Sequence, residues 1–243
     1  VFAYSFQEML PNVDVIILKD LFLNYPFLKI IFYTIGLTAL SNGFNMIDGM
    51  NGLAGLTALN ILIGLFSILL LVGTLNLFFN EIFFLFLIIL AFLLFNFPYG
   101  KIFLGDAGAY WLGWILGVLI ILAYSHNSMN TWGAVLIIFY PLMEVVFSTI
   151  RKISIRTNPF KSDLNHLHLK LYFTLKGPVE RSQRFNSFTT LCLMPFWCMP
   201  PLLIIWVNYY SHISLVFLLW ILSQIYQFHP KEILSNQVVL VLC

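Results

Sequence analysis

Long uninterrupted apolar stretches limit how this chain folds more than any other feature. The stretch 53–72 has 20 residues without one charged side chain. A helix rises 1.5 Å per residue, so about 20 apolar residues cross the ~30 Å hydrocarbon layer of a membrane. A membrane β-barrel would instead need alternating polar and apolar residues. The pattern therefore predicts membrane-spanning helices.

The composition supports a single all-α membrane domain over residues 1–243. Hydrophobic residues make up 60% of the chain and charged residues 9%, whereas soluble domains carry about 25% charged residues. So little charge excludes a soluble globular domain and a disordered chain. We expect a polytopic helical bundle that is integral to the membrane. Its seven predicted spans are residues 27–41, 53–72, 82–97, 109–125, 132–150, 188–207 and 213–228.

Basic residues gather in the loop 151–187 and predict the orientation. This loop contains eight Lys or Arg residues and only two acidic residues, Asp163 and Glu180. Short loops rich in Lys and Arg stay in the cytoplasm. Much of this charge is explained by its role in setting the topology and by contact with anionic lipid headgroups, without a bound ligand. Counting spans back from this loop places the loops 42–52 and 98–108 on the same, cytoplasmic, face.

The first of these loops repeats polar side chains every three residues. In SNGFNMIDGMNGLAG, residues 41–55, they are Asn42, Asn45, Asp48 and Asn51. A spacing of three brings side chains to one side of a helical turn. An isolated Asp-Gly pair is usually a simple turn, but four such groups are costly to bury without partners. We expect them to face water or a polar ligand.

The second loop places a carboxylate between glycines. In FPYGKIFLGDAGAYWLGW, residues 97–114, Asp106 lies between Gly105 and Gly108, directly before an apolar helix. One interpretation is purely structural, because Asp is a preferred N-cap and glycines mark turns. The other is that small residues let backbone N–H groups approach a phosphate at the helix N-terminus, while the carboxylate takes a cation such as Mg²⁺.

The third loop carries two histidines. In DLNHLHLKLY, residues 163–172, His166 and His168 would share a side in an extended chain but diverge on a helix. A zinc site needs more than two nitrogen or sulfur ligands. Histidines beside many basic groups better suit the binding of a diphosphate.

Glu144 is an ionisable residue inside the predicted span 132–150. Ionisable residues in membrane segments are candidates for function. A structural pair with Arg151, after a helix bend at Pro141, is an equally supported interpretation. The sequence leaves both open.

The three loops together resemble the polyprenyl-phosphate N-acetylhexosamine-1-phosphate transferases. NGFNMIDGMNGLAG resembles that family's Asn-x-x-Asn-x-x-Asp-Gly motif, KIFLGDAGAYWLG resembles its Ile-Phe-x-Gly-Asp-x-Gly motif, and HLHL resembles its histidine motif. YPLMEVVFSTIRK also matches the span before the histidines. The order, spacing and membrane side of the motifs agree over residues 27–171.

The resemblance implies an enzyme of the bacterial inner membrane with its active site on the cytoplasmic face. Family members transfer a sugar-1-phosphate from a UDP-sugar to a polyprenyl phosphate and release UMP, as the first membrane step of cell-envelope polysaccharide synthesis. The implied partners are a UDP-N-acetylhexosamine, polyprenyl (undecaprenyl) phosphate and the membrane, with no nucleic acid. The implied cofactor is Mg²⁺ or Mn²⁺, held by Asp106. The implied catalytic residues are Asp48, Asp106, His166 and His168, and the implied substrate contacts are Asn42, Asn45, Asn51, Lys101 and Gly105.

Some positions depart from the family pattern. The family has an Asp-Asp pair in an earlier cytoplasmic loop and more spans than are predicted here, whereas this sequence has no Asp-Asp and begins with Val1. We therefore expect an upstream segment to be missing and the chain alone to be inactive or severely impaired. Leu169 stands where a further His is common in the family, and Asn51 stands where some members have Asp. These two differences leave the identity of the sugar undetermined.

Two other classes of protein are alternatives. A transporter or channel places polar groups and broken helices near the middle of the membrane, whereas the polar motifs here cluster at one surface. A non-catalytic membrane scaffold is the second alternative, and the missing Asp-Asp pair favours it. Replacing Asp106 with Asn would separate these classes, because a transferase would lose lipid-linked sugar formation and a scaffold would keep its partners.

Overall fold

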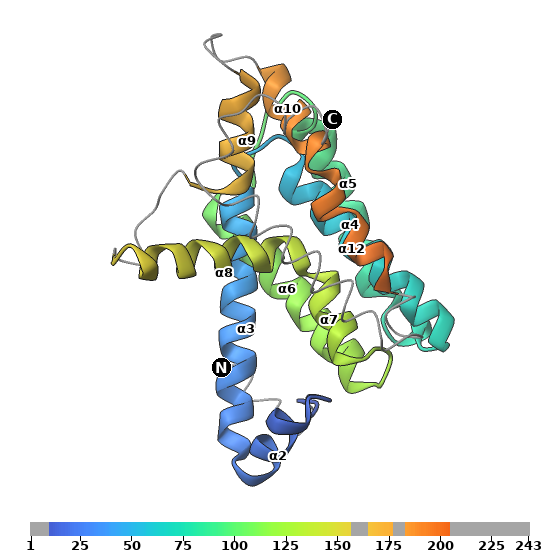
Figure 1. Cartoon of the computed structure of the whole chain (residues 1–243). Helices are drawn as coiled ribbons and strands as arrows, with labels where there is room; N and C mark the ends of the chain where they lie inside the picture. Colours follow the sequence, from blue (N-terminus) through green and yellow to red (C-terminus); the bar gives the residue numbers. More distant parts are fainter. Residues whose placement is uncertain (1–9, 157–164, 177–182, 205–243) are drawn as a thin grey trace.

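The computed structural model describes residues 10–156, 165–176 and 183–204. These residues form helices and no strand, which confirms the all-α fold class (Figure 1). The helices are α2 (Ile16–Asn24), α3 (Pro26–Ile47), α4 (Leu53–Val72), the short 3₁₀ helix η2 (Leu75–Leu77), α5 (Phe79–Asn96), α6 (Gly105–Ser125), α7 (Thr131–Ile137), α8 (Phe139–Ser154), α9 (Leu167–Lys176), α10 (Gln183–Cys192), α11 (Met194–Trp197) and α12 (Met199–Leu202).

Four helices are long and apolar enough to cross a membrane, namely α3, α4, α5 and α6. Each overlaps one of the first four predicted spans. Large apolar side chains remain exposed on these helices; on α5, for example, Phe84 is 61% and Leu94 is 75% exposed. Such exposure is unfavourable in water, and it fits helices whose outer surface is surrounded by lipid.

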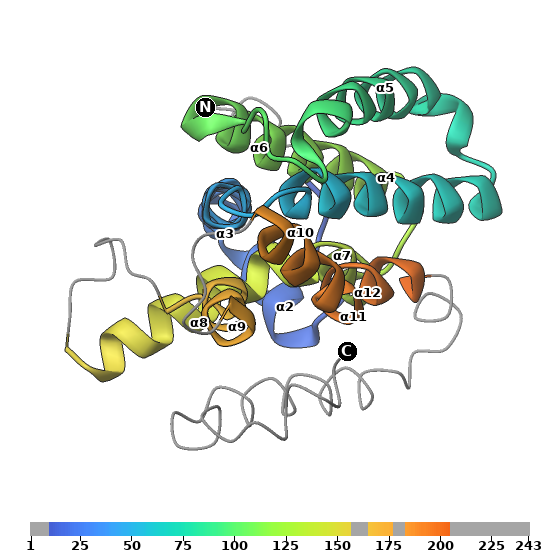
Figure 2. The same cartoon turned by 90° about the horizontal axis from the view of Figure 1, so that it is seen from above.

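The predicted span over residues 132–150 is not one continuous helix. The segment is divided into α7 and α8, which are bent by 83° relative to each other. Pro141 explains the break, because a proline ring clashes with the carbonyl group four residues earlier, and that residue, Ile137, is the last of α7. The predicted bend is therefore confirmed, and it turns α8 across α3 (Figures 1 and 2).

The total of seven spans is not confirmed. The described residues contain four candidate spans, or five if the bent pair α7 and α8 is counted as one. The predicted span 188–207, as far as residue 204, is divided among α10, α11 and α12. Prolines stand in the first turns of α11 and α12, where they cannot continue the preceding helix. The predicted span 213–228 lies outside the described residues.

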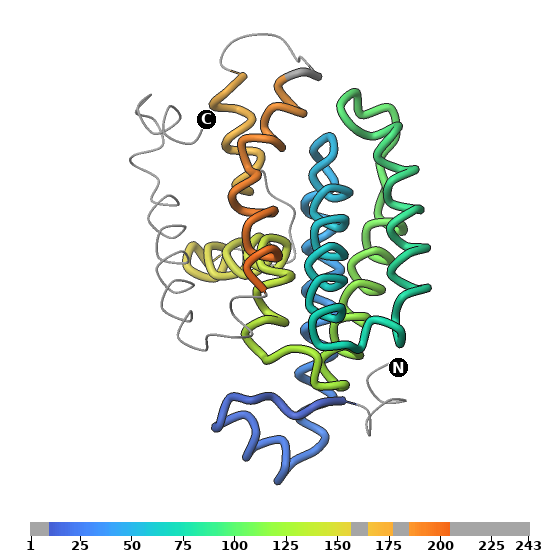
Figure 3. The backbone as a smooth tube through the Cα atoms, turned by 90° about the vertical axis from the view of Figure 1, so that its right-hand side faces the viewer, coloured from blue at the N-terminus to red at the C-terminus, as the bar shows by residue number. Residues whose placement is uncertain are grey.

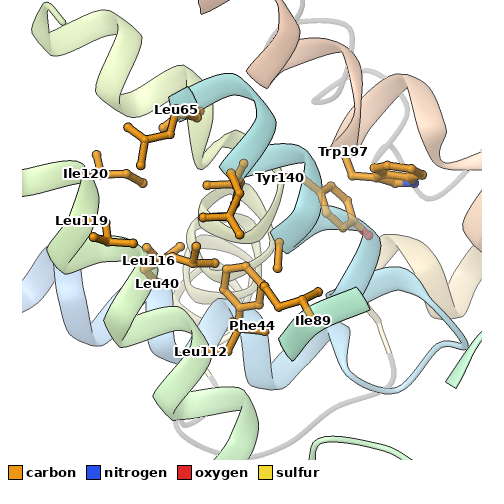
Figure 4. Packing of buried hydrophobic residues seen from close by; sticks show 14 of the residues in the cluster. Leu40, Phe44, Leu65, Ile89, Leu112, Leu116, Leu119, Ile120, Tyr140 and Trp197 are labelled. Atoms are coloured by element: carbon orange, nitrogen blue, oxygen red, sulfur yellow. The ribbon is translucent and has the colours of Figure 1, made fainter. Parts of the chain in front are cut away.

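The helix α3 holds the bundle together. It packs against α6 and α8, while α4 packs against α5 and α12. Leu40 and Phe44 of α3 are fully buried with Leu112 and Leu116 of α6 (Figure 4). Gly113 of α6 brings the two backbones close, because a Cβ atom there would lie 2.8 Å from the carbonyl oxygen of Leu40.

The three motif loops lie at one end of the bundle. At this end α3 stops and α4 begins, and the connection from α5 to α6 reaches it as well (Figures 1 and 3). The helices α9 and α10 also lie at this end, whereas the connection from α4 to α5 lies at the opposite end (Figure 3). The expectation that the three loops share a face therefore agrees with the fold.

Gly43 lies where α3 crosses α8, and it limits the size of the side chain there. A Cβ atom at Gly43 would lie 2.4 Å from the carbonyl oxygen of Pro141. We expect Gly43→Ala to force the two helices apart and to destabilise the protein by roughly 1–3 kcal/mol, the usual cost of overpacking. A lower Tm of the variant in detergent would show this effect.

Gly36→Ala is the matched control. Gly36 lies in the same helix, and nothing lies within 4 Å of the position that its Cβ atom would take. Alanine is a better helix former than glycine by about 1 kcal/mol, so this variant should keep or raise the Tm. A Gly43→Ala protein that is as stable as Gly36→Ala would contradict the close crossing of α3 and α8.

Candidate active site

A hydrogen bond joins the first two motifs. Asp48, the C-cap residue of α3, accepts the backbone N–H of Gly105 through Oδ2 at 3.1 Å, although the two residues are 57 positions apart in the sequence. Gly105 has a φ of +64°, a conformation that glycine adopts at little cost. Asp106 follows it in the first turn of α6 and is exposed. The two predicted catalytic carboxylates are therefore brought to one place.

Buried asparagines hold these two loops together. Asn96, at the end of α5, accepts the N–H of Gly52 through Oδ1 and donates through Nδ2 to the carbonyl of Ile102, both at 2.6 Å. Asn51 donates through Nδ2 to the carbonyl of Pro98 at 2.9 Å. Asn96 was not among the predicted site residues, and its only signal in the sequence is an amide at the end of the apolar run FLLF.

The side chain of Asn51 points into the protein. Asn51 is 2% exposed, and its backbone carbonyl accepts the hydroxyl of Thr190 of α10 at 2.8 Å. Its backbone N–H donates to Oδ1 of Asn186, also of α10. The amide of Asn51 thus stabilises the loop from inside, and contact between this side chain and a substrate stays a prediction.

The other predicted substrate contacts lie on or near the surface. Asn42 donates to the carbonyl of Thr38 of its own helix at 2.8 Å, and Asn45 donates to the hydroxyl of Tyr110 of α6 at 3.2 Å. Lys101 is exposed in the α5–α6 connection. Asn42, Asn45 and Lys101 therefore remain accessible to a ligand at this end of the bundle.

The histidines of the third motif meet at Glu144 of α8. Nδ1 of His166 lies 3.2 Å from Oε2 of Glu144, and Nδ1 of His168 lies 3.0 Å from Oε1. The two imidazole rings stack with centroids 5.5 Å apart. His166 precedes α9, and its carbonyl accepts the N–H of Lys170. Because the helix begins only after His166, the two rings can share one side.

Of the two interpretations that the sequence left open for Glu144, the structural pair with Arg151 is not the one found. In the described part of the chain its carboxylate is shared by His166, His168 and Tyr140, whose hydroxyl donates to Oε1 at 3.0 Å. Arg151 instead donates through Nη1 to the carbonyl of Asn165 at 2.7 Å. The helix α8 therefore holds both the imidazole rings and the backbone directly before them. Asp163 of the same motif lies outside the described residues.

Burial changes the acidity of Asp48. It raises the pKa of the carboxyl from its usual 3.8 to about 6, while hydrogen bonds from the backbone N–H groups of Leu104 and Gly105 oppose the rise. The negative charge of Asp106 adds to it. A cation bound near these two residues would oppose this repulsion and favour the ionised form of Asp48.

These residues fit a divalent cation that arrives with phosphate. Among residues 10–156, 165–176 and 183–204, no three or more His, Cys, Asp or Glu side chains are grouped to hold a metal by themselves. Mg²⁺ typically binds through one or two carboxylates, with phosphate oxygens and water completing its shell. Asp106, exposed beside Asp48, offers such a carboxylate.

Comparison with known proteins identifies relatives for part of the chain. Residues 2–124 match the model of glycosyl transferase family 4. The undecaprenyl-phosphate alpha-N-acetylglucosaminyl 1-phosphate transferase of Thermotoga maritima is 32% identical over 57% of this chain and 41% of its own length. The phospho-N-acetylmuramoyl-pentapeptide-transferase of Petrotoga mobilis is 34% identical over 46% of this chain and 38% of its own length.

A more distant relative shows the same partial coverage. The decaprenyl-phosphate N-acetylglucosaminephosphotransferase of Mycobacterium leprae is 27% identical over 58% of this chain and 41% of its own length. The chain therefore spans less than half the length of the relatives that it matches. No solved structure matches the chain significantly.

Asp48→Asn is expected to stabilise the protein at neutral pH, because it removes a half-buried charge and keeps an acceptor for Gly105. The folded-state pKa of about 6 exceeds the usual 3.8, so the wild-type protein loses stability as the pH rises between these values. We expect the Tm of the variant to exceed that of the wild type by a constant margin above pH 6, and by a smaller margin as the pH falls toward 3.8.

Thermal unfolding in detergent with EDTA, which removes divalent cations, measures this margin. Asp20→Asn is the control, because Asp20 is an exposed carboxylate of α2, and its Tm should equal that of the wild type at each pH. A Tm of Asp48→Asn below that of the wild type at pH about 8 would contradict the burial penalty.

Proposed function

Because the chain belongs to glycosyl transferase family 4, we propose that it transfers an N-acetylhexosamine-1-phosphate from a UDP-sugar to a polyprenyl phosphate and releases UMP. The relatives from Thermotoga and Mycobacterium are named for a polyprenyl-phosphate acceptor and for N-acetylglucosamine. These names support a lipid phosphate as the acceptor here. They also make N-acetylglucosamine the first sugar to test.

The hydrogen bond between Asp48 and Gly105 is the observation that carries this proposal. It joins the first motif to the loop that presents Asp106, at the end of four apolar helices. A reaction between a water-soluble nucleotide sugar and the phosphate of a membrane lipid needs a site at such a boundary. A polar site in the middle of the spans, as expected for a transporter, would not meet this need.

The net reaction exchanges one oxygen substituent on phosphorus. An oxygen of the lipid phosphate bonds to the sugar-bearing phosphorus, and the bond from that phosphorus to UMP breaks, so that UMP leaves with the bridging oxygen. Catalysis of phosphoryl transfer consists mainly of positioning the reactants and stabilising charge on the phosphate oxygens. The protein must therefore hold two anionic groups close together.

Each part of the candidate site has a role in this proposal. Asp106 and the phosphate oxygens would hold Mg²⁺ or Mn²⁺, which when bound neutralises charge on the diphosphate. Asp48 orients the loop that carries Asp106 through the N–H of Gly105, and the exposed ammonium of Lys101 attracts phosphate. His166 and His168 would contact the diphosphate or the sugar, and Asn42 and Asn45 would line the nucleotide side, whereas Asn51 holds the loop from inside.

The charges in the loops support a location for the site. The loop 151–187 has eight basic and two acidic residues, and such loops remain in the cytoplasm. We therefore place the site at the cytoplasmic face of the bacterial inner membrane. The proposed product, a sugar joined by a diphosphate to a polyprenyl lipid, is a starting point for cell-envelope polysaccharides.

Asp106→Asn should abolish transfer while the protein remains folded, because it removes the carboxylate proposed to hold the metal. We expect the rate to fall by at least about 100-fold, the size of effect seen when one electrostatic contact to a transition state is lost. The assay incubates membranes from cells expressing the complete coding sequence with labelled UDP-N-acetylglucosamine and undecaprenyl phosphate. Lipid-linked label and released UMP are then measured.

Chelation by EDTA should stop transfer in the wild type, and added Mg²⁺ or Mn²⁺ should restore it. Asp20→Asn, which changes an exposed carboxylate of α2, should transfer at the wild-type rate. Full activity of Asp106→Asn, or transfer that survives EDTA, would refute the proposed role of Asp106. Wild-type membranes that form no lipid-linked sugar from any UDP-N-acetylhexosamine would refute the proposed function.

A further inference from the structure

Glu144 is a buried carboxylate in apolar surroundings. It is 5% exposed, and besides Tyr140 the small cavity next to it is lined by the apolar side chains of Phe139, Met143, Phe147, Leu167 and Phe196. Burying a carboxylate is costly unless hydrogen bonds compensate for the lost water. Here three donors do so, because Tyr140, His166 and His168 all point their polar atoms at it.

With Glu144 ionised, the geometry of this cluster fixes the protonation of one ring nitrogen, Nδ1, of each imidazole. An ionised carboxylate only accepts hydrogen bonds, and each of its oxygens is bonded to the Nδ1 atom of one histidine. Each Nδ1 must therefore carry a hydrogen. Nε2 lies on the other side of each ring, so it is directed away from Glu144, and its protonation decides the charge of the imidazole.

We propose that Glu144 is a positioning residue for the reaction, which holds His166 and His168 in the Nδ1–H form and in one fixed orientation, with Nε2 of each ring directed away from the carboxylate. This inference rests on the proposed function. Carboxylates that fix the tautomer and orientation of a functional histidine are common in enzymes. The unusual feature here is that one carboxylate serves two stacked rings, whose planes differ by only 8°.

Burial explains why this carboxylate can control both rings. Glu144 and His168 are shielded from water, with side-chain exposures of 4% and 1%, so water cannot replace either hydrogen bond. Arg151 adds a second constraint, because it holds the carbonyl of Asn165 directly before His166. Both contacts come from α8, so this helix determines where the histidines stand.

Glu144→Gln tests the proposal with a spectroscopic measurement. Glutamine has one acceptor oxygen and one donor NH₂ group, so it can accept a hydrogen bond from only one Nδ1–H. We expect ¹⁵N spectra of the histidine-labelled wild type to show two histidines in the Nδ1–H form, and those of Glu144→Gln to show one of them changed to the Nε2–H form. His166→Gln and His168→Gln assign the two signals.

Transfer activity provides the second measurement. We expect kcat of Glu144→Gln to fall on the order of 10–100-fold, as when the hydrogen-bond partner of a functional histidine is removed, with little change in KM for the UDP-sugar. Glu144→Asp keeps the carboxylate and should retain both Nδ1–H signals and more activity than Glu144→Gln. Glu81→Gln is the matched control, because Glu81 is an exposed glutamate of α5, and it should match the wild type in both measurements.

Tyr140→Phe is a control that disturbs the cluster around Glu144 without removing its bonds to the imidazoles. It removes one donor to Glu144 but keeps both bonds to the imidazoles, so both histidines should stay in the Nδ1–H form. Either histidine in the Nε2–H form in the wild type would overturn the inference. Full kcat in a Glu144→Gln protein that has lost one Nδ1–H signal would overturn it as well.

The two proposals fail in different ways. A wild type with both Nδ1–H signals but no sugar transfer would refute the proposed function, and with it the catalytic part of this inference. A wild type that transfers sugar but lacks these signals would refute the role of Glu144 and leave the proposed function intact.

Discussion

The crossing of α3 and α8 sets the geometry on which the candidate site depends. At Gly43 the two backbones come so close that no side chain fits between them. Asp48 lies five residues further along α3, about 7.5 Å at the helical rise, and Glu144 lies three residues beyond Pro141, about 4.5 Å along α8. This backbone contact therefore joins the helix that ends at Asp48 to the helix that carries Glu144.

Polar groups at the ends of the apolar helices complete this arrangement. Loops near a membrane surface must satisfy their backbone N–H and carbonyl groups without much water. Asn51 and Asn96 do this for the α3–α4 and α5–α6 connections, each through its side-chain amide. As a result, the exposed side chains of Asp106 and Lys101 extend from loops that these buried hydrogen bonds already hold in place. The polar motifs are thus partly structural and partly available to a ligand.

Several features of the fold and the candidate site could be predicted from local sequence. Apolar stretches of about 20 residues specify spanning helices because the thickness of the bilayer sets their length. Pro141 specifies a break because its ring and missing N–H act within one turn. The pairing of Glu144 could not be predicted in this way, since Arg151 is near it in sequence whereas His166 and His168 are 22 and 24 residues away. The buried bonds of Asn51 and Asn96 likewise join residues from separate helices.

The sequence by itself determined that this chain forms apolar helices, that a proline interrupts the segment 132–150, and that three polar motifs lie near helix ends. These properties depend on the chain's local conformation and on the contrast between water and hydrocarbon. Only the tertiary structure decided that the break turns α8 by 83° across α3, that Asp48 bonds to Gly105, and that one buried glutamate holds both histidines. Each of these results depends on which distant side chains and backbone groups meet, because a buried polar atom bonds to whichever partner the packing places within reach.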